Sequence, residues 1–191
     1  LTVLGASLVW VGWFGFNGGS TVSMTGDDTI LSVSSIMVTT NMAAAAGAVT
    51  TMLLTWVKYG KPDVSMTLNG GLAGLVAITA GTDVVSVAGS FWIGVIAGIA
   101  IVYAVEFVGQ KMKIDDPVGA ISAHGVCGAL GTILTGVFSV KDGLLYTGDP
   151  HFLMIQILGV VVVGLYVFVA INIRFRIIKA TNGLRVTCAE E

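Results

Sequence analysis

Residues 115–138 read DDPVGAISAHGVCGALGTILTGVF, two acids and a proline followed by an apolar, glycine-rich run. The acids and Pro117 predict the sharp start of a helix, because acidic side chains favour the positive end of a helix dipole and proline is tolerated in the first turn. The run from 118 to 138 is about as long as a membrane crossing requires. Its one ionisable side chain is His124, near the middle.

On a regular α-helix the face that carries His124 would be made of small residues, whereas bulky residues would lie roughly opposite. One small residue lies four positions before His124, and three lie four, seven and eleven positions after it. They are Ala120, Gly128, Gly131 and Thr135. The bulky ones are Val126, Leu130, Ile133 and Val137. Two interpretations remain open. The helix lines a narrow passage, or the small residues form a groove against another helix, with His124 hydrogen-bonded across it.

The composition is that of a membrane protein. The chain has 191 residues, of which 55% are hydrophobic and only 10% charged, whereas soluble domains carry about 25% charged residues. There is no basic patch for nucleic acid. The sequence offers no cofactor motif, no nucleophile paired with a base and too few histidines for a metal site. We therefore expect no enzyme, and we expect Cys127 and Cys188 to be free thiols.

Six apolar segments separated by polar turns predict six transmembrane helices. They show no alternation with a period of two, so the fold class is all-α rather than a membrane barrel. We expect residues 1–180 to form a transmembrane domain and 181–191 to begin a cytoplasmic tail. The chain has no Met at its start and no Lys or Arg before Lys58, so we expect a piece of a longer protein, not a signal peptide. The segments are about 1–19, 30–57, 65–80, 84–108, 118–138 and 152–173.

The cations predict the orientation. With six alternating spans, eight of the nine Lys and Arg residues fall on one side of the membrane and only Lys141 falls on the other. An excess of cations marks the cytoplasmic side. The first span therefore runs outward, Ser20 lies at the outer mouth and the C-terminus is cytoplasmic.

Polar and aromatic residues inside these spans are candidates for function, because they are costly in a bilayer. His124 lies about seven residues above the cytoplasmic start of its helix, or about 10 Å at 1.5 Å per residue. Its imidazole can donate and accept hydrogen bonds and can relay a proton. Trp13, Phe16 and Ser20 share one face of the first span. Aromatic faces attract cations, although an aromatic stripe that only packs within a bundle is the alternative.

Several motifs resemble the ammonium transporter (Amt/Mep/Rh) family, in the right order along the whole chain. They are Gly12–Ser20, Leu68–Val76, the His124 segment with its leading Asp115-Asp116-Pro117, and Gly183–Val186. The resemblance implies an eleven-helix fold of two inverted five-helix repeats and a long last helix, assembled as a homotrimer with one pore per subunit. This chain resembles the second repeat plus the last helix, so half of the family's pore is absent from it.

The resemblance also implies roles for individual residues. His124 is similar to the second of two pore histidines, Phe16 to one of two phenylalanines that gate the outer pore, and Trp13 to the pore-lining Trp below. Ser20 resembles the hydroxyl of the outer ammonium-recruitment site. Ala120 matches an apolar pore-lining position.

The function that the resemblance implies is membrane transport. Ammonium would be recruited outside and deprotonated, and ammonia and a proton would cross a histidine-lined hydrophobic pore in the cell membrane. A signal protein of the PII type is an expected partner at the cytoplasmic face. Two alternatives remain: an ammonium sensor of the same fold, and an Rh-like channel for neutral gas.

Overall fold

The computed structural model describes residues 1–184, in which there are helices and turns but no strand. Six long helical segments follow one another. They are α1 (Thr2–Gly19), α2 (Asp27–Tyr59), α3 (Val64–Ile78), α4 (Val87–Glu106) continued by the π-helix η1 (Phe107–Lys111), the π-helix η2 (Ile121–Val126) continued by α5 (Cys127–Phe138), and α7 (His151–Thr181). A single short helical turn, α6 (Leu144–Thr147), precedes α7.

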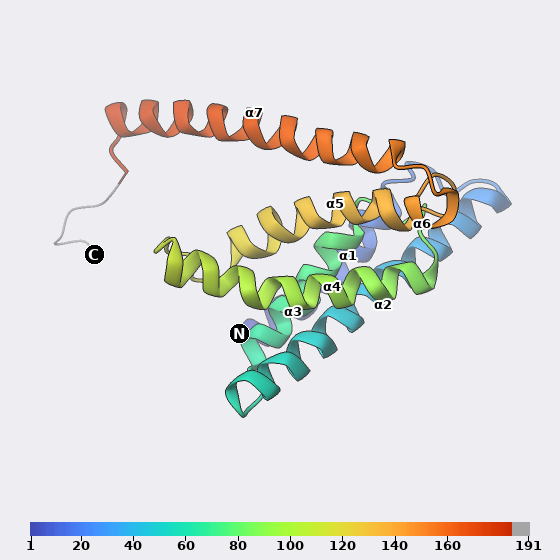
Figure 1. Cartoon of the computed structure of the whole chain (residues 1–191), viewed down its shortest axis with the longest axis horizontal. Coiled ribbons are helices and arrows are strands. Elements are labelled where there is room, and N and C mark those ends of the chain that lie inside the picture. Colours follow the sequence, from blue (N-terminus) through green and yellow to red (C-terminus); the bar gives the residue numbers. More distant parts are fainter. Residues whose placement is uncertain (185–191) are drawn as a thin grey trace.

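Each of the six predicted spans is a helix, and successive helices run in alternating directions (Figure 1). The turns after α1, α3 and α5 lie at one end of the bundle. The turns after α2 and η1, and the end of α7, lie at the other end (Figure 1). This arrangement is that of a multi-pass membrane protein.

Four helical segments are long and apolar enough to cross a membrane: Asp27–Tyr59, Val87–Lys111, Ile121–Phe138 and His151–Thr181. The other two are shorter or more polar. α3 is an apolar helix of 15 residues. α1 has 18 residues and carries Asn17 and several glycines near its end. The fold is therefore an all-α membrane fold, with α1 and α3 as its least typical members.

The core is built where α2, α3 and α4 approach one another through glycines. A Cβ atom built on Gly74 of α3 would lie 2.2 Å from the Ala43 carbonyl oxygen of α2, and one built on Gly94 of α4 would lie 2.3 Å from the same oxygen. No side chain fits such gaps. Glycine at both positions lets two helices contact the backbone of α2, which gives close packing in place of the hydrophobic drive that lipid does not supply.

Hydroxyl groups of α2 add hydrogen bonds between elements inside this core. Thr51 Oγ1 donates to the Gly98 carbonyl of α4 at 2.8 Å, and Thr39 Oγ1 donates to the Thr82 carbonyl after α3 at 2.9 Å. Both threonines are fully buried. Because a polar group in an apolar core needs a partner, these bonds fix how α2 lies against its neighbours.

α7 lies outside this core. It runs beside α5 (Figure 1), and none of its residues is buried. The helix continues to Thr181, beyond the predicted end of the sixth span at 173 and close to the predicted domain boundary at 180. The predicted tail reaches from 181 to 191, of which residues 185–191, with Cys188, lie outside the described part.

The contact between α5 and α3 leads to a first prediction. A Cβ atom on Gly131 would lie 2.1 Å from the Ala77 carbonyl oxygen. Gly131→Ala should therefore force α5 away from α3 and lower the free energy of unfolding by about 1–3 kcal/mol. Thermal unfolding of the detergent-solubilised full-length protein that contains this chain measures the loss.

Gly159→Ala is the matched control, because Gly159 lies inside a helix with nothing within 4 Å of the added atom. It should leave the melting temperature unchanged or raise it slightly, since Ala favours helix over Gly. Equal melting temperatures for the two variants would contradict the close approach of α5 to α3.

Candidate functional site: an aromatic and imidazole face

The helix that carries His124 begins later than predicted. Pro117 and Val118 form a turn, which the Gly119 amide closes by donating to the Asp116 carbonyl at 3.0 Å. Gly119 has a φ of +69°, a left-handed conformation that suits glycine and that separates the turn from the helix. The helix starts at Ala120. The prediction that the acids and Pro117 form the first turn is therefore wrong.

Asp116 nevertheless caps this helix through its side chain. One carboxylate oxygen accepts from the Ile121 amide at 3.2 Å, and the other accepts from the Ser122 amide and hydroxyl at 3.3 Å each. These are amides of the first turn, which have no partner within the helix. The negative charge also matches the positive end of the helix dipole. Asp116 thus holds the start of the segment that presents His124.

The first turns of this segment form the π-helix η2, Ile121–Val126. Its i→i+5 hydrogen bonds place more residues in each turn than an α-helix does, so the predicted α-helical face is broken. Gly131 and Thr135 are buried, whereas His124 and Ala120 are exposed. The close-packing interpretation is confirmed for Gly131, which contacts α3. The side chain of His124 makes no hydrogen bond to another residue among 1–184, so its part of that interpretation stays a prediction.

His124 lies instead in a row of aromatic rings. Its imidazole stacks on the Trp13 indole, with ring centroids 6.4 Å apart and planes 21° apart. The Phe16 ring also neighbours Trp13, with ring centroids 5.5 Å apart and planes tilted by 50°. We call Phe16, Trp13 and His124 the aromatic row. The two segments that supply it, α1 and η2, lie more than 100 positions apart in the sequence, so only the fold brings these rings together.

The Trp13 indole has a hydrogen-bond partner that the sequence did not indicate. Trp13 Nε1 donates to Thr79 Oγ1 at 2.9 Å. Thr79 is the residue that ends α3, and its hydroxyl donates in turn to the Leu75 carbonyl at 2.7 Å. The sequence feature that could have drawn attention to Thr79 is its hydroxyl at the end of a mainly apolar helix. The spacing of the residues gave no reason to pair it with Trp13.

Ser20 lies at the end of α1, one turn after Phe16. Its hydroxyl donates to the Phe16 carbonyl at 2.8 Å, and the residue is exposed. Asn17 between them is buried, and its side chain donates to Thr40 Oγ1 of α2 at 3.0 Å. The Asn17 bond anchors the end of α1 on α2 and so fixes the position from which Phe16 and Ser20 project.

The structure therefore brings together four of the five predicted site residues, and the fifth, Ala120, starts the helix one turn before His124. The aromatic row is open on one side, because Phe16 is 61% exposed and His124 is exposed as well. An ionisable side chain within a membrane span faces the protein interior or a water-filled cavity rather than lipid.

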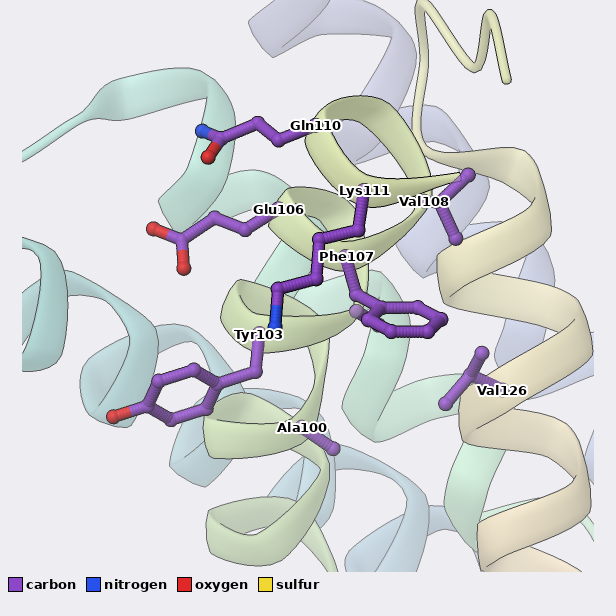
Figure 2. A pocket seen from close by; sticks show the side chains of 9 residues that line it. Ala100, Tyr103, Glu106, Phe107, Val108, Gln110, Lys111 and Val126 are labelled. Atoms are coloured by element: carbon purple, nitrogen blue, oxygen red, sulfur yellow. The ribbon is translucent and has the colours of Figure 1, made fainter. Parts of the chain in front are cut away.

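A separate pocket of about 520 Å³ lies between η1 with the end of α4 and η2. Figure 2 shows Phe107 and Val126 facing each other across it, while Glu106 and Gln110 extend away from Val126. Glu106 accepts a hydrogen bond from Lys58 at 2.5 Å and another from the Tyr59 hydroxyl. These bonds tie the ends of α2 and α4 together. None of the residues of the aromatic row lines this pocket.

Cys127, directly after η2, is buried and free, as predicted. Its thiol lies 3.9 Å from the Ala97 carbonyl of α4. Within the described residues no group of three His, Cys, Asp or Glu side chains is placed to hold a metal ion. The groups that the site offers in this chain are its aromatic rings, the imidazole of His124 and the hydroxyls of Ser20 and Thr79.

The model of the Ammonium Transporter Family matches residues 1–191. The chain belongs to the ammonium transporter family. It is 43% identical to ammonium transporter Amt2 of Archaeoglobus fulgidus over 99% of this chain and 42% of the relative. It is 38% identical to the ammonium transporter of Aquifex aeolicus over 100% of this chain and 45% of that protein. The predicted family is confirmed.

Solved structures of this family share the fold. A structure described as a sensor Amt protein superposes with a TM-score of 0.88 at 37% identity, covering 97% of this chain and 45% of that one. Candida albicans Mep2 superposes with a TM-score of 0.88 at 30% identity, covering 99% and 43%. The chain thus spans slightly less than half the length of the relatives it matches, in agreement with the predicted partial fold.

The cap on η2 leads to a second prediction. Asp116→Ala removes the acceptor for two amides and one hydroxyl, so the start of η2 should open about 1 kcal/mol more easily. Hydrogen–deuterium exchange of the backbone amides of residues 120–126, in the full-length protein, should become several-fold faster. Asp115→Ala is the control, because Asp115 is exposed and caps no amide of the described chain. Equal exchange in both variants would contradict the cap.

Proposed function

We propose that a full-length protein containing this chain transports ammonium across a membrane, and that this chain supplies one side of the pore. The stacking of the Trp13 indole on the His124 imidazole, continued by Phe16, is the observation that carries the proposal. It places an imidazole and two aromatic rings in one exposed row on a membrane-spanning fold, next to the hydroxyl of Ser20. Family membership supports the substrate.

Recruitment falls to Ser20 and the aromatic rings. The single proton of the Ser20 hydroxyl is committed to the Phe16 carbonyl, so its oxygen is left as an acceptor. Ammonium carries four N–H donors and a charge, and therefore matches an acceptor beside a ring face. The exposed position at the end of α1 allows this contact before the cation loses its water.

Deprotonation follows from the cost of moving charge into an apolar passage. A full charge in a low-dielectric environment is expensive, whereas neutral ammonia is not. Ammonium would therefore lose its proton near Phe16 and pass as ammonia along Trp13 and His124. An imidazole can accept a hydrogen bond from ammonia at one nitrogen and donate at the other. Potassium has no proton to lose and would be rejected.

The remaining side of the pore belongs to the portion that the relatives have and this chain lacks, because this chain covers only 42–45% of Amt2 and the Aquifex relative. Inverted repeats place the solute route at their interface. The exposed aromatic row is the surface on which the first repeat, absent from this chain, would close the route. The assembly proposed is a homotrimer with one such pore in each subunit.

The proposed membrane is the cell membrane, with Ser20 outside and the end of α7 in the cytoplasm. The side with eight of the nine Lys and Arg residues is then cytoplasmic, as the distribution of cations favours. Ala120, at the cytoplasmic start of the His124 helix, would line the inner part of the route. A PII-type signal protein is the partner proposed for this face.

A sensor of the same fold is the second candidate function. It is favoured by the likeness to the sensor Amt protein, which is as close in TM-score as the likeness to Mep2. The fold alone therefore does not separate transport from sensing. An ammonium-evoked current separates the two, because a sensor without transport produces none. A flux of ammonia into proteoliposomes without any current would instead indicate a channel for neutral gas.

Ser20→Ala should weaken recruitment without slowing conduction. The concentration of ammonium that gives half of the maximal current should rise about fivefold, since one hydrogen bond to a cation at an exposed position contributes about 1 kcal/mol. The maximal current on proteoliposomes should stay the same. Ser7→Ala is the control, because the Ser7 hydroxyl donates to the Val3 carbonyl in the same way at the far end of α1. A lower maximal current with unchanged half-saturation would contradict the recruitment role.

His124→Ala should act on conduction. The ammonium-evoked current should fall by more than about tenfold, because the imidazole is the group in this half that exchanges protons and hydrogen bonds with the solute. His151→Ala is the control, since His151 is exposed at the start of α7, away from the aromatic row. An unchanged, ammonium-selective current in His124→Ala would contradict the role proposed for this residue.

A further inference from the structure

We infer that Thr79 is a positioning residue of the pore: its hydroxyl fixes the plane of the Trp13 indole, and through the indole the position of the His124 imidazole. The inference rests on the proposed function for its effect on transport, but its structural part stands by itself. Three contacts carry that structural part: the hydrogen bond from Thr79 to Leu75, the hydrogen bond from Trp13 to Thr79, and the stacking of Trp13 on His124. They link three helical segments, α3, α1 and η2.

The direction of the hydrogen bonds gives Thr79 its role. A threonine hydroxyl has one proton, and that proton is donated to the Leu75 carbonyl at 2.7 Å. An indole N–H can only donate. The bond of 2.9 Å between Trp13 Nε1 and Thr79 Oγ1 therefore runs from the indole to the hydroxyl, with the donor and acceptor roles fixed at both ends.

The position of Thr79 in the fold makes this acceptor rigid. Thr79 follows α3 directly, and its own amide donates to the Val76 carbonyl at 3.3 Å. α3 carries buried residues throughout its second half and contacts the backbone of α2 at Gly70 and Gly74. Trp13 lies on α1, whose outward side is largely exposed. The bond thus ties a ring on a peripheral helix to a helix of the core.

The Trp13 ring is the one group in the described chain with which the His124 side chain forms a hydrogen bond or a ring stack. Its side chain makes no hydrogen bond to residues 1–184, and its one aromatic neighbour there is Trp13, at 6.4 Å between centroids. η2 presents it from a π-helix, whose wider turn leaves the backbone less regular than an α-helix. If the indole rotates, the surface against which the imidazole stacks moves with it.

The role inferred for Thr79 is to hold a ring, because its proton is committed to Leu75 and one of its two lone pairs accepts from Trp13. This distinguishes it from Ser20, whose hydroxyl also donates backward, to the Phe16 carbonyl, but has no donor on its oxygen among the described residues. Both hydroxyls donate to the carbonyl four residues earlier, and only that of Thr79 accepts from a ring.

Thr79→Val tests the inference, since valine keeps the shape and removes the acceptor. In the full-length protein in proteoliposomes, the maximal ammonium-evoked current should fall by roughly three- to tenfold, the equivalent of one lost hydrogen bond. The ammonium concentration for half-maximal current should not change, because Ser20 is untouched. Thr79→Ser, which keeps the hydroxyl, should restore most of the current. Thr132→Val is the matched control, because the Thr132 hydroxyl donates to the Gly128 carbonyl without accepting from a ring.

Ultraviolet resonance Raman spectroscopy of the indole N–H supplies a readout that does not depend on transport. The spectrum of Thr79→Val should show one tryptophan that has lost its hydrogen bond, and the difference should vanish in a Trp13→Phe background. If the wild-type protein carries no ammonium current but the Raman difference appears, the proposed function fails while the tie between Thr79 and Trp13 holds.

Three results would overturn the inference. The first is a Thr79→Val protein with the same current and the same Raman spectrum as Thr132→Val. The second is a Thr79→Ser protein as impaired as Thr79→Val, which would show that the methyl packing of Thr79 matters and its oxygen does not. The third is a changed half-saturation with an unchanged maximal current, which would place Thr79 in recruitment.

Discussion

The approach of two helices to the backbone of a third is the contact on which the rest of this structure depends. α3 and α4 both reach the Ala43 carbonyl of α2, through Gly74 and Gly94, at separations that no side chain permits. Lipid offers no hydrophobic drive between helices, so close van der Waals contact and buried hydroxyl bonds must hold the bundle. Because this packing holds α3 in place, Thr79 at its end has a fixed position. The hydrogen bond from Trp13 to Thr79 then fixes the indole ring.

The start of the His124 helix, in contrast, is held through a side chain. Its first turns are π-helical, begin after a left-handed Gly119 and are held by the side chain of Asp116. The i→i+5 bonds of such a segment depart from the regular α-helical pattern. Stacking against an indole that is itself fixed gives the imidazole a defined place without a rigid helix behind it. The packed core holds α3 in place. The hydrogen bond between Thr79 and Trp13 and the stacking of Trp13 on His124 then position the side chains of the site.

The fold could be predicted from the sequence to the extent that it follows from hydropathy. Six long apolar segments give six helices, because each span must satisfy its backbone hydrogen bonds internally. The ends lie within a few residues of those predicted, except that α7 continues to Thr181 instead of ending at 173. The face of His124 was predicted wrongly, because regular α-helical spacing was carried through a segment whose turns are π-helical. Local spacing gives no sign of that change. The partnership of Trp13 with Thr79 was missed for a related reason: the two residues are 66 positions apart, and only the packing of α1 on α3 brings them together.

The hydroxyls of the site share one feature that bears on the choice of solute. Ser20 and Thr79 each donate to the carbonyl four residues earlier, so each presents only acceptor lone pairs. At Thr79 one of them accepts from Trp13, which gives that hydroxyl a structural contact. At Ser20 no residue of the described chain donates to the oxygen, which lies one turn after Phe16. An open acceptor beside an aromatic face favours a solute that is both cationic and rich in N–H donors, as ammonium is. A cation of similar size without N–H groups is attracted by the ring face through its charge, but it cannot donate a hydrogen bond to the hydroxyl oxygen. On the proposed function, discrimination therefore begins at the mouth, before the proton is lost, and the apolar row behind Phe16 completes it by excluding whatever cannot become neutral.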